Sequence, residues 1–409
     1  MKELLTIAYY YPPLGGIGAL RPLHFSRYLP NFGWRSSVVS VSNDTNYLHD
    51  NSLMQLVPKG QAVYRAYRPP VFETIRRFAR KGLRKYPLAY SFLDPQFDWV
   101  PNAISAGLKL AKTTSFNAIL ATAPPFSAIR VASRLKKKLK IPIVADLRDP
   151  FTINVMNWPS KYHRKFYEVY WRKLLASFDR AIVLADFVID HLVESLGLSH
   201  LEPVLIPNGY DPADFDGLKV NPPSDRFLLG YAGSFYGKMT PEPLFKSLKL
   251  AFKDRPEMRD DIQISFMGRM SEGLILGLAR KYELEREVQL LGFREHRYAI
   301  DFIRGCHVLL LFTGMVYKSA SGKIFEYAAS GRPVLSFGVQ EFTSKFIEEN
   351  HFGYSVDGSN PKDGAEKIVE LYDVWKSGGG VFTPSPEKYT QYSRKQLTGK
   401  LADLLDELA

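Results

Sequence analysis

Short apolar segments alternate with helical segments along both halves of the chain, and this alternation constrains the fold more than any other feature. In the first half, strand-like runs occur at 4–9, 36–41, 118–121, 143–146, 180–184 and 204–206. The second half repeats the pattern with runs at 228–231, 263–267, 288–290, 308–312 and 333–336. Strands that alternate with helices form parallel sheets covered by helices. We therefore predict an α/β protein with two doubly wound parallel-sheet, Rossmann-like domains.

A segment rich in turn-forming residues separates the two halves. It runs from Pro207-Asn-Gly-Tyr-Asp-Pro212 to Asn221-Pro-Pro223 and contains few apolar residues. The 409 residues exceed what a single hydrophobic core usually supports. We predict a first domain over 1–212, a second over 224–385, and a C-terminal helix within 386–409 that packs back toward the first domain.

The excess positive charge of the chain lies in its first half. Residues 1–220 hold 29 Lys and Arg against 17 Asp and Glu, whereas residues 221–409 hold 25 of each kind. The densest run, 75–86, places apolar residues on one helical stripe among Arg76, Arg77, Arg80 and Lys81. Such a helix suits an anionic membrane surface, where each cation contributes about 1 kcal/mol. The alternative is a solvated helix face. No nucleic-acid-binding motif accompanies the charge, so we expect no nucleic-acid partner.

The targeting and redox features predict a cytoplasmic location. Cys306 is the single cysteine, so no disulfide forms within the chain. The N-terminus lacks a signal-peptide pattern, and no uncharged apolar run approaches ~18 residues. We expect a cytoplasmic protein, peripheral at the inner face of the cell membrane if the basic helix binds there.

The segment Ser319–Leu335 has the pattern of an anion site. Small residues and Gly322 precede an amphipathic helix with Lys323 in its first turn and Glu326 one turn later. A helix N-terminus offers free N–H groups and the positive end of the helix dipole to an anion. Glu326 can accept hydrogen bonds from a diol such as ribose. These features suggest a nucleotide diphosphate, and the alternative is an ordinary capped helix with a surface lysine.

Eight short motifs, in order, carry a family resemblance. They are Tyr10–Gly18 (YYPPLGGIG), Ala121–Ser127 (ATAPPFS), Asp146–Pro150 (DLRDP), Ile206–Asp211 (IPNGYD), Tyr231–Phe235 (YAGSF), Ser265–Gly268 (SFMG), Leu291–Phe293 (LGF) and Ser321–Tyr327 (SGKIFEY). With this set the chain resembles the retaining GT-B glycosyltransferases of family four, especially the branch found in bacterial surface-polysaccharide gene clusters. That resemblance covers roughly residues 3–356.

The resemblance implies two domains that face each other across a cleft and assigns roles to individual residues. Glu326 would hold the ribose, and Arg269 and Phe293 would lie near the base, although Phe293 is equally expected as a core aromatic. Asp149, at a strand end, would orient the acceptor hydroxyl or cap a helix. The residues expected at the donor phosphates and sugar are Gly15, Gly16, Gly233, Ser234, Lys238, Ser321, Gly322 and Lys323.

Two positions depart from the family pattern. Lys318 occupies the place of a glutamate that contacts the donor sugar, and Ser234 occupies that of an arginine at the diphosphate. Losing a cation there removes a strong, charge-assisted contact. We expect Lys318, Lys323 or Arg21 to compensate. These departures place the identity of the donor sugar in question.

The function that the resemblance implies is retaining sugar transfer from a nucleotide diphosphate sugar, without a cofactor or a metal ion. Asp149, Lys323 and Glu326 are the candidate catalytic residues. The acceptor would be a glycan or a polyprenyl-diphosphate-linked sugar in bacterial surface-polysaccharide synthesis. Two alternatives remain: a sugar-nucleotide 2-epimerase on a similar fold, and a non-catalytic nucleotide-binding protein on a degenerate transferase scaffold.

Overall fold

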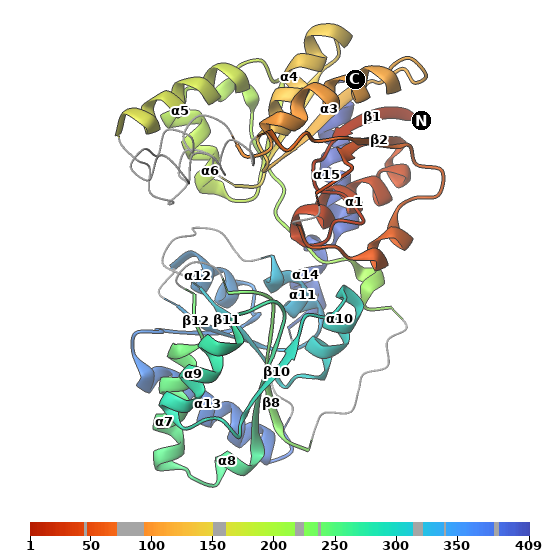
Figure 1. The fold of residues 1–409 in the computed structure, drawn as a ribbon. Helices are drawn as coiled ribbons and strands as arrows, with labels where there is room; N and C mark the ends of the chain where they lie inside the picture. Colours follow the sequence, from red (N-terminus) through yellow and green to blue (C-terminus); the bar gives the residue numbers. More distant parts are fainter. Residues whose placement is uncertain are drawn as a thin grey trace. The chain divides into compact units, whose positions relative to one another are not determined.

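Two compact units make up the chain. The computed structural model describes residues 1–44, 47–71, 94–149, 161–216, 225–235, 239–313, 322–338, 341–379 and 384–409. One unit combines Met1–Asn208 with Arg394–Ala409, and the other is the continuous segment Gly209–Ser393. The boundary at Asn208 falls inside the turn-rich segment, and the end of the chain belongs to the first unit (Figure 1).

The first unit contains a seven-stranded sheet in the order β3-β2-β1-β4-β5-β6-β7. All neighbouring strands pair in parallel, as the alternation with helices requires. The order reverses between β1 and β4, next to the first strand of the unit. The strands are β1 (Lys2–Ile7), β2 (Trp34–Val41), β3 (Val63–Ala66), β4 (Ala118–Ala123), β5 (Ile143–Leu147), β6 (Arg180–Val183) and β7 (Val204–Leu205).

Helices bury both faces of this sheet. Alternate residues of the strands pack on α3 (Val100–Leu110), α4 (Ser127–Leu139), α5 (Lys161–Leu175) and α6 (Asp186–Asp190). The opposite face packs on α1 (Ile17–Tyr28) and on α15 (Arg394–Asp406). Figure 1 shows α15 beside α1, although the two helices come from opposite ends of the chain. Their leucine and phenylalanine side chains join one cluster, so the C-terminal helix completes the core of the first unit.

The second unit repeats this architecture with a six-stranded parallel sheet in the order β10-β9-β8-β11-β12-β13. Its order reverses between β8 and β11. The strands are β8 (Phe227–Ala232), β9 (Ile262–Met267), β10 (Val288–Gly292), β11 (Val308–Phe312), β12 (Val334–Phe337) and β13 (Gly353–Val356).

Helices also cover both faces of the second sheet. One face packs on α7 (Glu242–Asp254), α9 (Glu272–Tyr282) and α13 (Pro361–Lys376), with the short α8 (Met258–Asp261) at its end. The other packs on α10 (His296–Gly305), α11 (Lys323–Ala329) and α12 (Glu341–Glu349). Helix α14 (Pro386–Tyr389) contacts α11.

The two parallel sheets with their surrounding helices confirm the predicted fold class. The predicted strands match within about two residues, and most of them carry a buried apolar run that is clear in the sequence. Two strands were not predicted: β3 and β13 have four residues each, and most of their residues are only half-buried. Helix α1 begins at Ile17 and is followed by a 3₁₀ turn over Leu29–Phe32, with Gly33 in the left-handed region.

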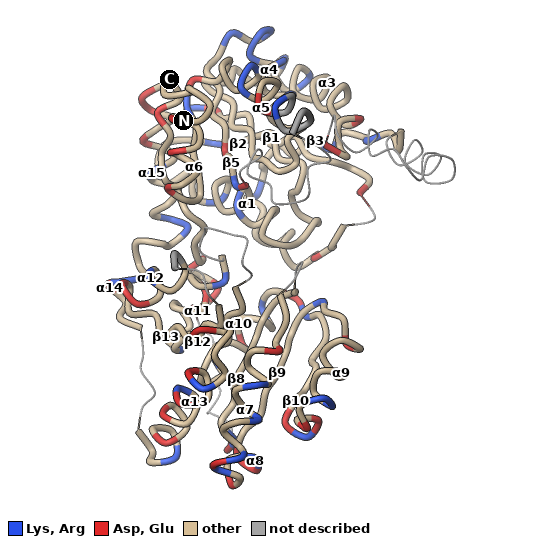
Figure 2. Tube along the Cα trace, turned by 90° about the vertical axis from the view of Figure 1, so that its left-hand side faces the viewer, with Lys and Arg blue, Asp and Glu red and all other residues tan. Residues whose placement is uncertain are grey.

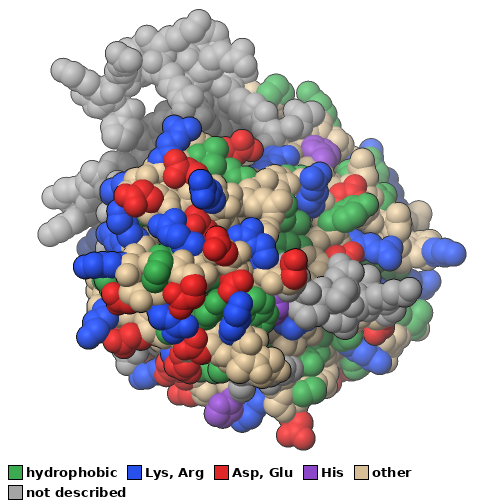
Figure 3. Space-filling model, turned by 90° about the horizontal axis from the view of Figure 1, so that it is seen from below, with side chains coloured by type: hydrophobic (Ala, Val, Ile, Leu, Met, Phe, Trp, Pro, Cys, Tyr) green, Lys and Arg blue, Asp and Glu red, His purple; other side chains and the backbone are tan. Residues whose placement is uncertain are grey.

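The charges are distributed unevenly over the described surface. Lys and Arg gather along α4 and α5 of the first unit (Figure 2), whereas cations and anions intermingle on the face seen in Figure 3. Three lysines occupy the last turn of α4, where they favour the helix dipole. The basic run 75–86, with Arg76, Arg77, Arg80 and Lys81, lies outside the described residues. Among the described helices none has the length and apolar character needed to span a bilayer.

Candidate functional site

Backbone hydrogen bonds draw three neighbouring strand ends of the second sheet together. Gly233, after β8, donates its N–H to the carbonyl oxygen of Met267 at 2.7 Å, and Gly268, after β9, donates to that of Gly292 at 2.9 Å. A Cβ atom on Gly268 would lie 2.1 Å from the Gly233 carbonyl oxygen, and both glycines have positive φ, 144° for Gly233 and 140° for Gly268. Side chains are therefore excluded at an edge where ligands of such sheets bind.

Lys323 brings a positive charge to this edge. Its Nζ donates a hydrogen bond to Tyr231 Oη at 2.9 Å and lies 4.5 Å from the centre of that ring. A Cβ atom on Gly233 would be 2.2 Å from Nζ. Burial lowers the pKa of Lys323 to about 8, and Glu326 opposes that shift. Because burial disfavours its charged form, the ammonium group gains stability when an anion approaches.

Helix α11 is tied directly to the end of β8. The hydroxyl of the buried Tyr327 accepts a hydrogen bond from the Ala232 N–H at 3.0 Å. This contact holds the first turn of α11, with Lys323, against the Gly233 loop, and the half-buried Glu326 lies one helical turn further along. No role for Tyr231 or Tyr327 was predicted from the sequence. The sequence features that could have indicated a role are the position of Tyr231 near the end of a strand and that of Tyr327 directly after Glu326.

Ser234 and Gly322 flank this cluster, while other expected donor residues are not described. The Ser234 carbonyl oxygen accepts a hydrogen bond from Tyr231 Oη at 2.9 Å. Gly322 precedes the first residue of α11, and no side chain caps the helix there. Lys238, Ser321 and Lys318 lie outside the described residues.

Arg269 and Phe293 form a pair at the ends of β9 and β10. The Arg269 guanidinium carbon lies 5.2 Å from the centre of the Phe293 ring. Phe293 is 39% exposed, so the alternative that placed it in the core is wrong. An exposed ring beside a guanidinium is suited to stacking on a planar ligand group.

In the first unit, the loop after β1 carries Gly15 and Gly16. Gly15 donates its N–H to the Leu48 carbonyl oxygen at 2.8 Å, and a Cβ atom there would lie 3.0 Å from Asp50 Cβ. Gly16 has φ 76° and its carbonyl oxygen accepts the N–H of Ala19 in the first turn of α1. Both glycines permit a compact turn at the carboxyl edge of the first sheet, by the strand where its order reverses.

The guanidinium of Arg21 binds groups inside the first unit. The expectation that it replaces the missing arginine at the diphosphate is therefore wrong. Its guanidinium pairs with Asp146 at 3.0 Å, and both side chains are fully buried. It also donates to the carbonyl oxygens of Ile206 and Pro207 at 2.9 Å. Asp146 accepts a further hydrogen bond from the Thr122 hydroxyl at 2.7 Å. These five groups satisfy one another, as buried charges require.

Asp149 lies two residues beyond β5, at the carboxyl edge of the first sheet. Its side chain reaches water, yet the protein packed around it removes part of the hydration of the carboxylate and raises its pKa, against the effect of Arg148. The alternative role, as a helix cap, involves residues from 150 onward, which lie outside the described residues.

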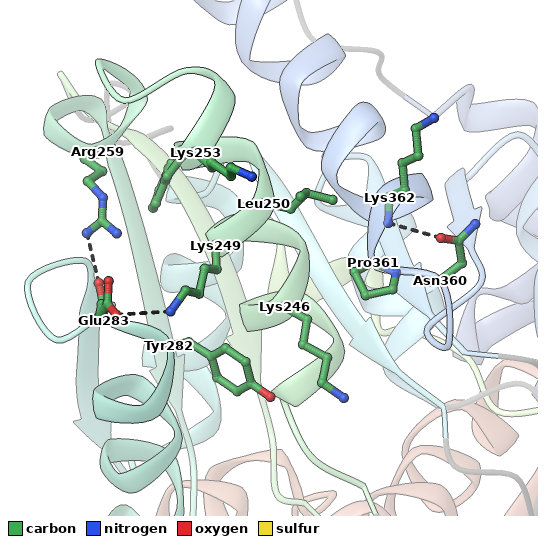
Figure 4. Close-up of a pocket in the computed structure, with 11 residues that line it drawn as sticks. Lys246, Lys249, Leu250, Lys253, Arg259, Tyr282, Glu283, Asn360, Pro361 and Lys362 are labelled. Carbon is green, nitrogen blue, oxygen red and sulfur yellow. Dashed lines mark hydrogen bonds and ion pairs between the residues drawn. The ribbon is translucent and has the colours of Figure 1, made fainter.

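A shallow hollow of about 690 Å³ lies elsewhere, on the outer side of α7 (Figure 4). Two of its cations are already engaged: Lys249 pairs with Glu283 at 3.1 Å, and Arg259 pairs with Glu287 at 3.0 Å. Its lining residues lie on α7, α8, α9 and α13, or next to the ends of α9 and α13. Within the described segments, no group of three or more His, Cys, Asp and Glu residues is arranged to hold a metal ion.

Family models match both units. Residues 23–214 match Glycosyltransferase Family 4, and residues 227–373 match Glycosyl transferases group 1. The chain belongs to the family-four glycosyltransferases. A search of curated protein sequences finds no match to this glycosyltransferase.

Solved structures share the fold of this glycosyltransferase over their whole length. HepE of Anabaena, in complex with UDP and glucose, is 14% identical with a TM-score of 0.66, and 100% of each chain is covered. A glycosyltransferase of Rickettsia africae is 15% identical with a TM-score of 0.67, covering 100% of this chain and 98% of the other. Sucrose-phosphate synthase of Thermosynechococcus elongatus is 15% identical with a TM-score of 0.65, covering 100% and 99%. The two domains are therefore those of the GT-B fold.

Proposed function

We propose that this glycosyltransferase takes a sugar from a nucleotide diphosphate sugar bound at the carboxyl edge of the second sheet. The observation that carries the proposal is Lys323, whose ammonium group lies against Gly233 and above the Tyr231 ring. The leaving group of such a donor is a diphosphate, and a fixed cation stabilises the charge that develops on it. The complexes of HepE with UDP and with UDP-glucose support this class of donor.

The other residues of the edge take roles that their chemistry suits. Glu326 accepts hydrogen bonds from the ribose hydroxyls, and the Arg269–Phe293 pair stacks on the base. The residues proposed to lie at the phosphates are Gly15, Gly16, Gly233, Ser234, Lys238, Ser321 and Gly322. The N–H groups of Gly15 and Gly233 are already engaged, so these two glycines contribute a close approach of the bare backbone. Lys323 supplies the cationic charge, so the proposed transfer needs no metal ion.

The proposed reaction retains the configuration at the anomeric carbon. An oxocarbenium-like transition state forms while the diphosphate departs, and no protein nucleophile is assigned. Asp149 orients the acceptor hydroxyl from the first unit. The acceptor is a glycan or a polyprenyl-diphosphate-linked sugar in bacterial surface-polysaccharide synthesis, at the cytoplasmic face of the cell membrane.

The membrane part of the proposal is tested with vesicles. We expect the protein to co-sediment with anionic liposomes and to lose that binding when Arg76, Arg77, Arg80 and Lys81 are neutralised together. Each cation contributes about 1 kcal/mol near such a surface. Equal binding to neutral and anionic liposomes, or full binding by the neutralised variant, would count against a membrane role for 75–86.

A thermal-shift panel of UDP, GDP, ADP and dTDP sugars tests the donor, because a ligand that binds the native state raises its melting temperature. We expect one nucleotide class to stabilise the protein, and Lys323→Met to reduce that shift. Lys253→Met, at an exposed site on α7, is the matched control and keeps the full shift. No shift with any donor contradicts the proposal.

Product analysis separates the remaining alternatives. With donor and acceptor, NMR of the product is expected to show the anomeric configuration of the donor, and EDTA is expected to leave the rate unchanged. An epimerised sugar nucleotide formed from donor alone favours the 2-epimerase. An inverted product contradicts the retaining mechanism but leaves the transferase assignment intact.

A further inference from the structure

Three side chains from separate loops meet at the carboxyl edge of the first sheet. Tyr10 lies in the loop after β1, Tyr47 in the segment after β2, and Arg148 directly after β5. The ring centres of Tyr10 and Tyr47 are 4.2 Å apart, with 24° between the ring planes. A Cβ atom on Gly18 would lie 3.1 Å from a terminal nitrogen of Arg148 and 3.3 Å from Tyr10 Cδ2. The guanidinium and the rings therefore border the same turn of α1.

The Arg148 side chain is half-buried and has no ion-pair partner among the described residues. Its side chain donates to the Pro124 carbonyl oxygen, and its buried Nε finds no hydrogen-bond partner within the described part of the chain. Asp146 is already bound by Arg21 and Thr122. Asp149 favours the charged guanidinium without forming an ion pair with it.

A guanidinium without an ion-pair partner is expected to bind an anion. Burial lowers the pKa of Arg148, because water no longer solvates the guanidinium fully, and the nearby Arg21 acts in the same direction. Leaving a buried charge without a partner costs free energy. A guanidinium recovers that energy best from a phosphate or carboxylate, which it can bind through two parallel hydrogen bonds.

The two tyrosines add a surface suited to a sugar ring. Both are half-buried, so each leaves part of its ring exposed. Burial, with Tyr47 and Asp44 close by, raises the pKa of the Tyr10 hydroxyl, which stays protonated and able to donate a hydrogen bond. A tyrosine presents an apolar ring and a polar tip together, which matches the C–H groups and hydroxyls of a pyranose.

We propose that Arg148, Tyr10 and Tyr47 form the acceptor subsite and that the acceptor carries a phosphate or carboxylate next to its terminal sugar. Arg148 binds the anionic group, and the tyrosine pair packs on the sugar. Asp149, the next residue along the chain, then lies beside the hydroxyl that receives the new sugar. This inference rests on the proposed function and adds that the acceptor is negatively charged next to its terminal sugar.

Titrations of the full-length protein with glucose 1-phosphate, glucuronate and glucose test this subsite. By calorimetry or saturation-transfer NMR, we expect at least one anionic sugar to bind about tenfold more tightly than glucose, as one charge-assisted contact implies. Arg148→Gln removes this preference. Preference for glucose 1-phosphate indicates a lipid-diphosphate-linked acceptor, and preference for glucuronate an acidic glycan.

Two variants separate the acceptor subsite from the donor site. Lys323→Met is expected to keep the preference for the anionic sugar while losing nucleotide stabilisation, and Arg148→Gln is expected to do the reverse. Arg134→Gln, at an exposed position of α4, is the matched control and changes neither. If Arg148→Gln retains nucleotide stabilisation but binds all three sugars as the wild type does, the proposal is overturned while the donor assignment stands.

Two further results would also contradict the proposal. Equal binding of all three sugars to the wild type overturns it directly. An equal loss of affinity for all three sugars in Arg148→Gln shows that Arg148 only supports the fold of the loop. Should that variant not fold, Arg148→Lys and Tyr47→Ala replace it: the first keeps the charge but loses the paired hydrogen bonds. An unchanged preference in both variants would sink the idea.

Discussion

At the scale of single residues, the proposed donor site depends on the absence of side chains at two glycines as much as on the presence of Lys323. Lys323 Nζ occupies the space that a side chain on Gly233 would need, and the Gly233 carbonyl oxygen occupies the space of one on Gly268. Tyr231 lies under the ammonium group as both ring and hydrogen-bond acceptor. The bare backbone and the buried cation are therefore parts of one arrangement.

Gly233→Ala tests this arrangement. The new Cβ would meet Nζ at 2.2 Å, at a φ of 144° that side chains rarely adopt. We expect the free energy of unfolding to fall by about 1–3 kcal/mol and nucleotide stabilisation to drop sharply. Urea unfolding and thermal shifts measure the two effects. The matched control is Gly277→Ala in the middle of α9, where no atom lies within 4 Å; it should stabilise the helix by up to about 1 kcal/mol. Equal stability of the two variants would contradict the arrangement.

The pKa of Lys323 predicts a pH dependence. Burial lowers it to about 8 in the free protein, and a bound diphosphate raises it because the anion favours the ammonium form. Nucleotide binding is therefore expected to take up a proton near pH 8 and to weaken as the pH rises above 8. Calorimetry in buffers of different ionisation enthalpy measures the uptake. Lys323→Met should abolish it, and pH-independent binding between pH 7 and 9 would refute the assignment.

The same shift has the opposite sign for stability in the absence of nucleotide. The lysine of the unfolded chain binds its proton more tightly than folded Lys323, whose pKa is lowered to about 8. Between pH 8 and the ordinary lysine pKa, the unfolded state holds more protons, so this group makes the folded protein more stable as the pH rises.

At the scale of elements, α11 and α15 connect parts of the chain that are distant in sequence. Helix α11 reaches the end of β8 through the Tyr327 hydroxyl, and α15 returns to pack on α1. Long buried strands were predictable because one short run contains their whole apolar signal. β3 and β13 were not, because four residues, three of them half-buried, carry too little periodicity.

Leu401→Ala in α15 tests whether the C-terminal helix completes the first core. Leu401 is fully buried in the cluster that includes Leu4, Phe25 and Val144. We expect a loss of about 2–5 kcal/mol in the free energy of unfolding of the first unit. Lys400→Ala, at the exposed neighbouring position, serves as the control and should change it by less than about 0.5 kcal/mol. Equal stabilities of the two variants would show that α15 adds little to that core.

At the scale of the whole molecule, the two units differ in which parts of the chain form them. The first unit needs both ends, Met1–Asn208 and Arg394–Ala409, whereas the second is continuous. Every described donor residue except Gly15 and Gly16 lies in the second. The N-terminal family model ends near this boundary and the C-terminal one begins after it.

The isolated segment Gly209–Ser393 is therefore expected to fold and to bind nucleotide within about tenfold of the full-length affinity, a loss equivalent to about 1.4 kcal/mol for the missing glycine loop. Calorimetry with the best nucleotide of the thermal-shift panel measures this. Sugar transfer should be absent, because Asp149 and the acceptor subsite belong to the first unit. A folded segment that does not bind nucleotide would place the main donor contacts in the first unit.

By itself, the sequence determined the two parallel sheets, most strand positions, and the grouping of Gly322, Lys323 and Glu326, because each depends on residues close together in the chain. Only the tertiary structure decided that Arg21 forms an ion pair with Asp146, that Phe293 is exposed, and that Lys323 lies over Tyr231. They depend on residues that are distant in the sequence: Arg21 and Asp146, for example, are 125 positions apart. Periodicity reports which face of an element is buried, but the partner on that face is chosen by the packing of distant segments.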